Sequence, residues 1–459
     1  MTNSAIKYDT ASYSKLNIKN KFDLTIYFVF SCAFIFNYIY LIKDSTIDDF
    51  FVILTFFIIG LISFIGLIKS KKMISVNRMF FLFIFLFFYL APLHQYFSNV
   101  KFWNVNTSYS SEDYLIANIL IIIHLLIYIL FNKIKIKPRK YKENKQKINN
   151  FTLLVYSLVT ILCIFLLYKE GKLIEIGSAN TDSEDSFTYM VLKILRMFPV
   201  LSLVYFIQKS KANQINVSKG IKKIFLFISW LSIAIIFFPL NGTMNRFFLF
   251  GTYIILIDNI FSGKKYKSFF LIIAFLGFGI VFPMFNFFKY HTISEISKIT
   301  IEWINLDFQD YDAYQIFMNS IKYVDSNGLM LGKNIITGIF GLIPRSIWTT
   351  KLYPSGSIVA EYFNASFTNV SCPLIAEFYL SNGTFGIIIF TALFSIFIKY
   401  IDVNSFNPKI KIFNSILIGL CFSLFRGALL PVMTFIYSIL IAYFAVIIIN
   451  KITILRRVE

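Results

Sequence analysis

The chain has 459 residues, of which 57% are hydrophobic and 15% charged, and its mean hydropathy is +0.69. A soluble protein of this size cannot cover its surface with so few polar groups, so the composition excludes that class and indicates a membrane protein. The net charge of +20 comes from short basic runs between apolar segments, which argues against a nucleic-acid-binding surface. The four cysteines are scattered and predict neither a disulfide framework nor a metal site.

Apolar runs of about 15–20 residues are typical of membrane-spanning helices. They recur along the whole chain, so we expect an all-α polytopic membrane protein with about twelve spans. The division would be 1–288 with the first nine spans, 289–383 as one large loop, and 384–459 with the last three spans and a tail. The expected spans are 24–42, 50–68, 79–93, 114–131, 151–168, 188–207, 224–240, 245–261, 269–288, 384–401, 412–429 and 431–449.

Lysine and arginine fix the expected orientation, because loops on the cytoplasmic side carry an excess of both. The basic runs at 69–78 and 133–147 decide it, and they predict that both chain ends are cytoplasmic and that the large loop lies outside. The short loops that would face outward contain only Lys43, Lys101, Lys169 and Lys172.

The large loop has helical patterns of its own. Apolar residues at helical spacing predict an amphipathic helix over Ile293–Leu306 and a second helix near Tyr311–Val324. Pro373 resembles a helix start, and we expect that helix to run to Tyr379 and to stop at Asn382 and Gly383. Short helices of this kind would cover a cavity at the membrane surface.

Five basic residues depart from the inward bias and stand near the expected outer face. Charges at membrane depth are costly and normally face the bundle interior or a wet cavity. Several of them at one depth indicate a bound anion, since guanidinium groups suit phosphate. The alternative is that each one reaches lipid headgroups singly. These residues are Lys193, Arg196, Arg246, Arg345 and Arg426.

The large loop also carries candidates for proton transfer. Glu361 and Glu377 are candidate general bases, and His291 is a weaker one that we group with the substrate-binding residues. Asp307, Asp310 and Asp312 would suit a divalent cation, although a solvated loop is the simpler interpretation, and we expect no metal site.

Several motifs resemble those of the bacterial O-antigen polymerases, the Wzy-type oligosaccharide repeat-unit polymerases. Arg345 and Gly356 match an Arg-x10-Gly spacing described for periplasmic loops of that family, whereas Arg246 has no glycine at the matching distance. The other segments that carry the resemblance are Gly332-Lys333, Gly341–Lys351 (GLIPRSIWTTK), Cys372–Glu377 (CPLIAE), Asn382–Gly386 (NGTFG) and Gly242–Arg246 (GTMNR).

The resemblance implies a GT-C-like helical bundle in the bacterial inner membrane and an inverting, metal-independent glycosyltransferase without a cofactor. Donor and acceptor would both be undecaprenyl-pyrophosphate-linked oligosaccharides, and a chain-length regulator protein would be a partner. Arg246, Arg345, Glu361 and Glu377 are the expected catalytic residues. The expected substrate-binding residues are Lys193, Arg196, Lys351, Arg426 and His291.

Two other functions fit the same architecture. An O-antigen ligase uses the same donor but delivers the glycan to a lipid A core. A flippase for lipid-linked oligosaccharides also has about twelve spans, but it needs charges along a path through the membrane. Here the clearest intramembrane basic pair, Lys193 and Arg196, is confined to the expected outer third, which favours the polymerase.

Overall fold

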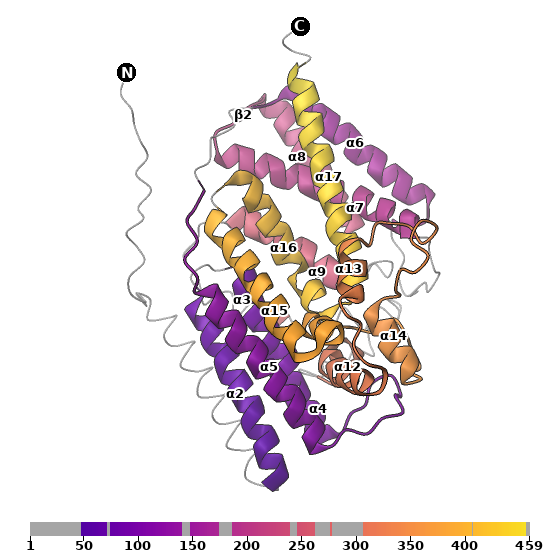
Figure 1. Ribbon diagram of the computed structural model, residues 1–459. Helices are drawn as coiled ribbons and strands as arrows, with labels where there is room; N and C mark the ends of the chain where they lie inside the picture. Colours follow the sequence, from indigo (N-terminus) through magenta and orange to yellow (C-terminus); the bar gives the residue numbers. More distant parts are fainter. Residues whose placement is uncertain are drawn as a thin grey trace, which may run out of the picture.

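The computed structural model describes residues 47–70, 74–139, 147–173, 186–238, 246–261, 276–277, 306–405 and 407–455. Within them the fold is a bundle of long helices with short helices at one end (Figure 1). The first half contains α2 (Ile47–Lys69), α3 (Val76–Phe85), the π-helix η1 (Leu86–Leu90), α4 (Ala91–Ser98), α5 (Ser111–Asn132), α6 (Asn150–Lys169) and α7 (Ser186–Lys211). The second half contains α8 (Lys219–Ile236), α9 (Arg246–Phe261), the short 3-10 helix η4 (Gln309–Tyr311), α12 (Ala313–Asn327), α13 (Lys333–Ile339), α14 (Ser355–Tyr362), α15 (Leu374–Asn404), α16 (Pro408–Arg426) and α17 (Leu429–Leu455).

Seven of the described helices are long and apolar enough to cross a membrane. This confirms the all-α membrane class. The expected spans at 224–240, 245–261 and 412–429 overlap α8, α9 and α16, which are not among the seven. The expected span at 24–42 lies outside the described residues, and so does that at 269–288 apart from residues 276 and 277.

Local sequence explains where several helices begin. The hydroxyl of Ser110 accepts a hydrogen bond from the backbone N–H of Asp113, and the Asp113 carboxylate accepts one from the N–H of Ser110, which forms a capping box at the start of α5. Asn149 caps α6 in a similar way by accepting from the N–H of Thr152. Asn149 also belongs to β1 (Ile148–Asn149), which pairs in parallel with β2 (Ile215–Asn216) and ties the start of α6 to the link between α7 and α8.

The bundle is assembled from helix pairs that are often distant in sequence. α2 packs against α3 and α5, α5 against α15, α6 against α8, α7 against α17, and α9 against α16. The α9–α16 crossing is close because glycine faces glycine: a Cβ on Gly251 would lie 2.2 Å from the carbonyl oxygen of Gly419. Small residues at a crossing let two backbones approach within a membrane.

The helix that begins after Pro373 breaks where the sequence predicts. Asn382 and Gly383 leave helical geometry, and the expected span at 384–401 follows at once, so α15 consists of two helices joined by a kink and runs to Asn404. Gly383 has φ +60°, a conformation that favours glycine. The expected helix near Tyr311–Val324 is confirmed as α12, whereas Ile293–Leu306 lies outside the described residues except for its last residue.

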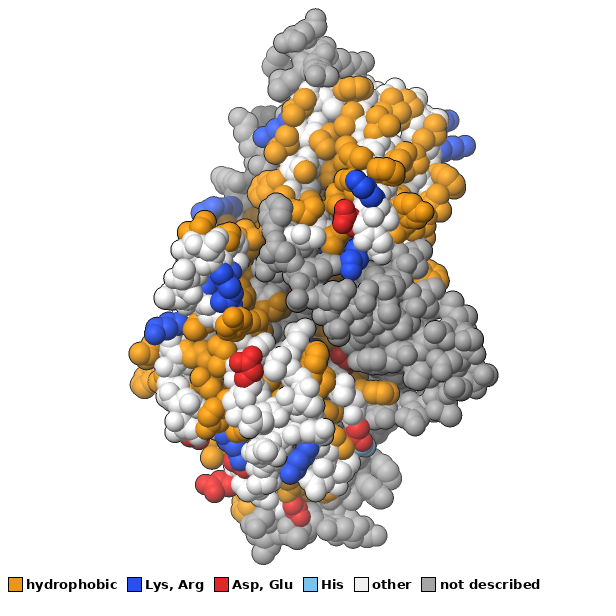
Figure 2. Space-filling model, turned by 90° about the vertical axis from the view of Figure 1, so that its right-hand side faces the viewer, with side chains coloured by type: hydrophobic (Ala, Val, Ile, Leu, Met, Phe, Trp, Pro, Cys, Tyr) orange, Lys and Arg blue, Asp and Glu red, His pale blue; other side chains and the backbone are white. Residues whose placement is uncertain are grey.

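Short helices and loops gather at one end of the bundle. We call the end where α7, α9 and α17 begin and α16 ends the loop end, and the opposite end the lysine-rich end. α12 and α14 lie at the loop end, away from the C-terminus (Figure 1). Figure 2 shows one long face, with hydrophobic side chains over much of its upper part and mainly polar and backbone atoms toward its lower end.

Candidate functional site

Three basic side chains are buried on two adjoining helices near the loop end. Lys193 and Arg196 on α7 are 2% and 5% exposed, and Arg246, the first residue of α9, is 5% exposed. α7 packs against α9, so these residues come from adjoining helices. The ammonium group of Lys193 lies 3.1 Å from the centre of the Phe435 ring on α17, and Arg196 donates to the carbonyl of Lys172 at 2.9 Å. We call Lys193, Arg196 and Arg246 the basic cluster.

Aromatic residues on α9 connect the basic cluster to the end of α16. The ring centroids of Phe248 and Phe435 lie 5.2 Å apart. On the neighbouring residue, Phe247, the ring lies 5.0 Å from the guanidinium carbon of Arg426. Two consecutive residues of α9 thus contact the end of α16 and the α17 ring over Lys193, while the shared depth of these cations stays a prediction.

Arg426 has a defined set of partners. Its guanidinium donates to the carbonyl of Asp310 at 2.7 Å, to that of Gln309 at 3.3 Å, and to the Asp312 carboxylate at 2.9 Å. Its own carbonyl accepts from the backbone N–H of Cys372 at 3.0 Å. Arg426 therefore joins three separate segments of the chain, which is a structural role.

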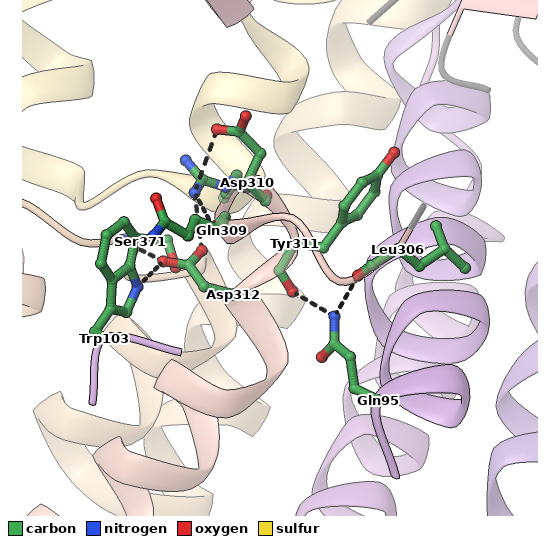
Figure 3. A network of polar contacts seen from close by, with 9 residues as sticks. Gln95, Trp103, Leu306, Gln309, Asp310, Tyr311, Asp312 and Ser371 are labelled. Atoms are coloured by element: carbon green, nitrogen blue, oxygen red, sulfur yellow. Dashed lines mark hydrogen bonds and ion pairs between the residues drawn. The ribbon is translucent and has the colours of Figure 1, made fainter. Parts of the chain in front are cut away.

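Asp312 is the centre of this network. Its carboxylate is fully buried and also accepts from the indole N–H of Trp103 at 2.9 Å and from the backbone N–H of Ser371 at 3.3 Å. Trp103 and Ser371 both point toward it (Figure 3). Nearby, the amide of Gln95 donates to the carbonyls of Leu306 and Tyr311. The chain from 306 to 312 is thus fixed on both sides, and it anchors α12.

Arg345 and Lys351 form a separate pair in the loop between α13 and α14. The guanidinium of Arg345 donates to the carbonyls of Lys351 and Leu352 at 2.6 and 2.9 Å and stacks 4.0 Å from the ring centre of Tyr353. Lys351 donates to the carbonyls of Gly341 and Ile343. Partial burial, and then the nearby charge of Arg345, lower the pKa of Lys351. Both cations shape the loop, and within the described residues the side-chain contacts of Arg345 stay inside it.

Glu377 is buried in a set of donors supplied by three helices. One carboxylate oxygen accepts from the backbone N–H of Leu429, the first residue of α17, at 2.7 Å. The other accepts from the hydroxyl of Ser355 on α14 at 2.7 Å and from the amide of Asn334 on α13 at 2.9 Å. The carboxylate therefore holds α13, α14 and α17 together, and it is already hydrogen-bonded on both oxygens.

The remaining expected residues fall in different places. Glu361, near the end of α14, is exposed to solvent, and His291 lies outside the described residues. Gly356, the glycine of the Arg-x10-Gly spacing, is required by packing: a Cβ there would lie 2.6 Å from the carbonyl oxygen of Ser371. The structure thus buries Lys193, Arg196 and Arg246 on the adjoining helices α7 and α9, holds Arg426 at the end of α16 against Phe247 of α9, and places Arg345, Lys351 and Glu361 elsewhere.

The three aspartates of the loop have different partners. Asp307 contacts the imidazole of His94 at 3.0 Å, Asp310 lies 3.9 Å from the guanidinium of Arg426, and Asp312 bonds to Arg426 directly. Among the residues that the structure describes, no three His, Cys, Asp or Glu side chains gather as ligands for a metal ion.

Sequence reasoning missed the partners that organise this end. Asp312 stood out only as one of three aspartates, and Trp103, Asn334 and Ser355 gave no signal, because their partners are distant in sequence. A comparison with protein families, with curated proteins and with solved structures finds no match to the chain.

Proposed function

We propose that the chain is an O-antigen polymerase, an inverting glycosyltransferase that joins undecaprenyl-pyrophosphate-linked oligosaccharide repeat units at the periplasmic face of the bacterial inner membrane. The observation that supports this best is the basic cluster, which lies at the loop end and is withdrawn from the surface. Cations at membrane depth normally serve a substrate or ion path. A diphosphate headgroup suits this arrangement, because guanidinium groups bind phosphate oxygens through paired hydrogen bonds.

The reaction places its charge where the cluster would act. A hydroxyl of one lipid-linked unit attacks the anomeric carbon of the growing chain, and the bond from that carbon to the pyrophosphate breaks. The electron pair leaves with the lipid pyrophosphate, and the proton of the hydroxyl passes to a base. Fixed cations near the leaving group stabilise the negative charge that develops in the transition state.

Burial and position suggest different roles for the expected site residues. Arg246, Lys193 and Arg196 are the most deeply buried cations among them and would bind the pyrophosphate. Arg196 would do so in addition to its bond to the carbonyl of Lys172. Arg345, Lys351 and Arg426, whose donors hold backbone carbonyls or Asp312, would shape the surrounding segments. Of the two carboxylates, Glu361 is open to a substrate and is the better base, whereas Glu377 is enclosed by its three donors.

The test is a rate measurement on purified protein in vesicles, with a lipid-pyrophosphate-linked repeat unit as the only sugar substrate. Arg246→Ala should lower the rate of polymer formation about 10²–10³-fold, the loss typical of removing one charge-stabilising donor. Arg246→Lys should recover part of it. The matched control is Lys219→Ala, which removes an exposed cation at the start of α8 and should leave the rate unchanged. A normal rate in a stably folded Arg246→Ala protein would contradict the proposal.

Deletion of the gene separates this function from its rivals. A strain without the polymerase should keep lipopolysaccharide with a single repeat unit. Lipopolysaccharide with no repeat unit at all would point to a ligase. Lipid-linked units that accumulate on the cytoplasmic side would point to a flippase.

A further inference from the structure

The exposed face of α13 is largely apolar. Ile336, Ile339 and the following Phe340 are exposed beside Lys333, whereas the buried face combines Ile335 with the polar or small residues Asn334, Thr337 and Gly338. A helix that meets water buries its apolar side chains and exposes its polar ones. A helix that meets lipid does the reverse, since small and polar residues make the contacts between helices there.

The position of α13 along α17 gives its depth. A Cβ on Gly338 would lie 2.5 Å from Leu429, and one on Gly341 would lie 2.7 Å from Leu430, so α13 lies directly against the start of α17. The hydroxyl of Tyr437 donates to the carbonyl of Ile339. A helical side chain points back toward the N-terminus of its helix, so the Tyr437 ring reaches toward the first turns of α17. α13 therefore lies beside the first turns of a helix that is long and apolar enough to span a membrane, rather than above it.

Further apolar side chains are exposed after α13 and on the two helices that it packs against. After the helix they include Phe340, which is 54% exposed, and Ile347, which is 77% exposed. α13 also packs against α15 and α17. Beyond its kink, α15 exposes apolar side chains at intervals of four residues, as a lipid-facing row does, and α17 has a similar row. These rows are Phe385, Ile389 and Leu393 on α15 and Ile441, Phe444 and Ile448 on α17.

Polar groups in the loop after α13 are also arranged as they would be in a membrane. Arg345 and Lys351 donate to the loop's own carbonyls, which reduces the number of backbone acceptors left without a partner. Backbone carbonyls need hydrogen-bond donors of this kind wherever irregular chain enters a membrane, because lipid supplies none. Trp348 follows directly, and tryptophan is enriched at the boundary between lipid and water.

We propose that α13 and residues 340–347 form a half-inserted element of the protein, with their exposed apolar side chains immersed in the hydrocarbon chains of the adjoining membrane leaflet. The partner is the ordinary acyl chains of the bilayer. The element would hold the loop of Arg345 at the headgroup level and would fix α13 against α15 and α17 from the lipid side.

The test is spin-label accessibility in the full chain, in vesicles of phosphatidylethanolamine and phosphatidylglycerol that contain no polyprenyl lipid. One label is attached at Phe340→Cys. The matched control is Tyr362→Cys on α14, which is exposed to a similar degree but lies in the part of the loop end that we assign to water. Both are made in a Cys32→Ser background, and Cys163, Cys372 and Cys421 are buried and should not react.

The expected result is that oxygen, which concentrates in lipid, relaxes the Phe340 label, and that a water-soluble nickel chelate does so only at Tyr362. Stronger relaxation of the Phe340 label by the nickel chelate would overturn the proposal. Broadening from a second label nearby would instead assign the surface to another copy of the chain. Shielding from the chelate only after polyprenyl phosphate is added would assign it to the carrier lipid, and either result would also overturn it. No turnover is needed, so the outcome is independent of the proposed polymerase activity.

Discussion

Glu377 receives hydrogen bonds on both oxygens of its buried carboxylate, so its side chain is sensitive to small changes. Glu377→Gln keeps the size but replaces one acceptor oxygen with a donor, which then faces Leu429, Ser355 or Asn334. Hydrogen bonds to a charged group contribute about 1.5–3 kcal/mol each, so we expect a clear loss of melting temperature in detergent. Glu361→Gln, on an exposed residue, should change it little. If Glu377→Gln instead kept its melting temperature but no longer formed polymer, Glu377 would be the general base of the reaction.

Asp312 offers a second test at this scale. Asp312→Ala removes the carboxylate that pairs with Arg426 and that accepts from Trp103 and Ser371. Removing one partner of a buried pair costs about 3–5 kcal/mol, and the slight exposure of Arg426 places the effect toward the lower end. The stability of Asp312→Asn should lie between that of Asp312→Ala and that of the original chain. Thermal unfolding in detergent measures all three, and equal stability of Asp312→Ala and the original chain would contradict the role of the network.

The basic residues show how far single positions can be predicted. Lys193, Arg196 and Arg246 are recognisable from sequence, because charge inside an apolar run is rare and must be sheltered. The partner of Arg426 is not recognisable, since Asp312 stands 114 positions away and only the fold brings the two together. Arg345 shows the same limit, because the sequence around it gives no sign that its guanidinium binds carbonyls of its own loop.

At the scale of elements, the sequence predicts a helix correctly where a long apolar run defines it. α5, α6 and α17 match their expected spans because length and hydropathy act over many residues. α13 was missed because a helix of seven residues that exposes its apolar face has no pattern that separates it from a loop. The break in α15 at Asn382 and Gly383 is predictable, because an Asn-Gly pair favours backbone angles outside the helix, and the apolar run at 384–401 predicts the helix that follows.

The crossing of α9 and α16 carries a prediction at the scale of elements. Gly251→Ala would put a methyl group against the backbone of Gly419, so the two helices must separate. Overpacking of this kind costs about 1–3 kcal/mol, and it would also shift Arg246 and Arg426, which lie at the loop ends of the same helices. We expect a lower melting temperature and slower polymer formation.

The matched control for that crossing is Gly220→Ala on α8, where a Cβ would meet nothing within 4 Å. Alanine is favoured over glycine in a helix by about 0.5–1 kcal/mol, so this variant should be as stable as the original chain or more so. Equal effects of the two substitutions would mean that the α9–α16 crossing is not close.

At the scale of the whole molecule, the two ends of the bundle differ in kind. The loop end holds the ordered segment from 306 to 373. At the opposite end, Lys69 closes α2, Lys133 caps α5, and Lys209 and Lys211 close α7. Because cytoplasmic loops carry an excess of lysine and arginine, we expect the lysine-rich end to face the cytoplasm. The basic cluster would then stand near the outer face, where a lipid-linked sugar is accessible after transport across the membrane.

Labelling of intact cells with a membrane-impermeant maleimide tests that orientation. Two exposed positions serve as reporters, both in the Cys32→Ser background: Thr368→Cys at the loop end and Asn213→Cys between α7 and β2. We expect the label at Thr368 in intact cells and at Asn213 only after the membrane is opened, because positive loops resist translocation. Detergent-opened cells, in which both positions react, control for access to the thiols. The reverse pattern would place the basic cluster on the cytoplasmic side, where assembled repeat units are not polymerised, and would remove the polymerase from consideration.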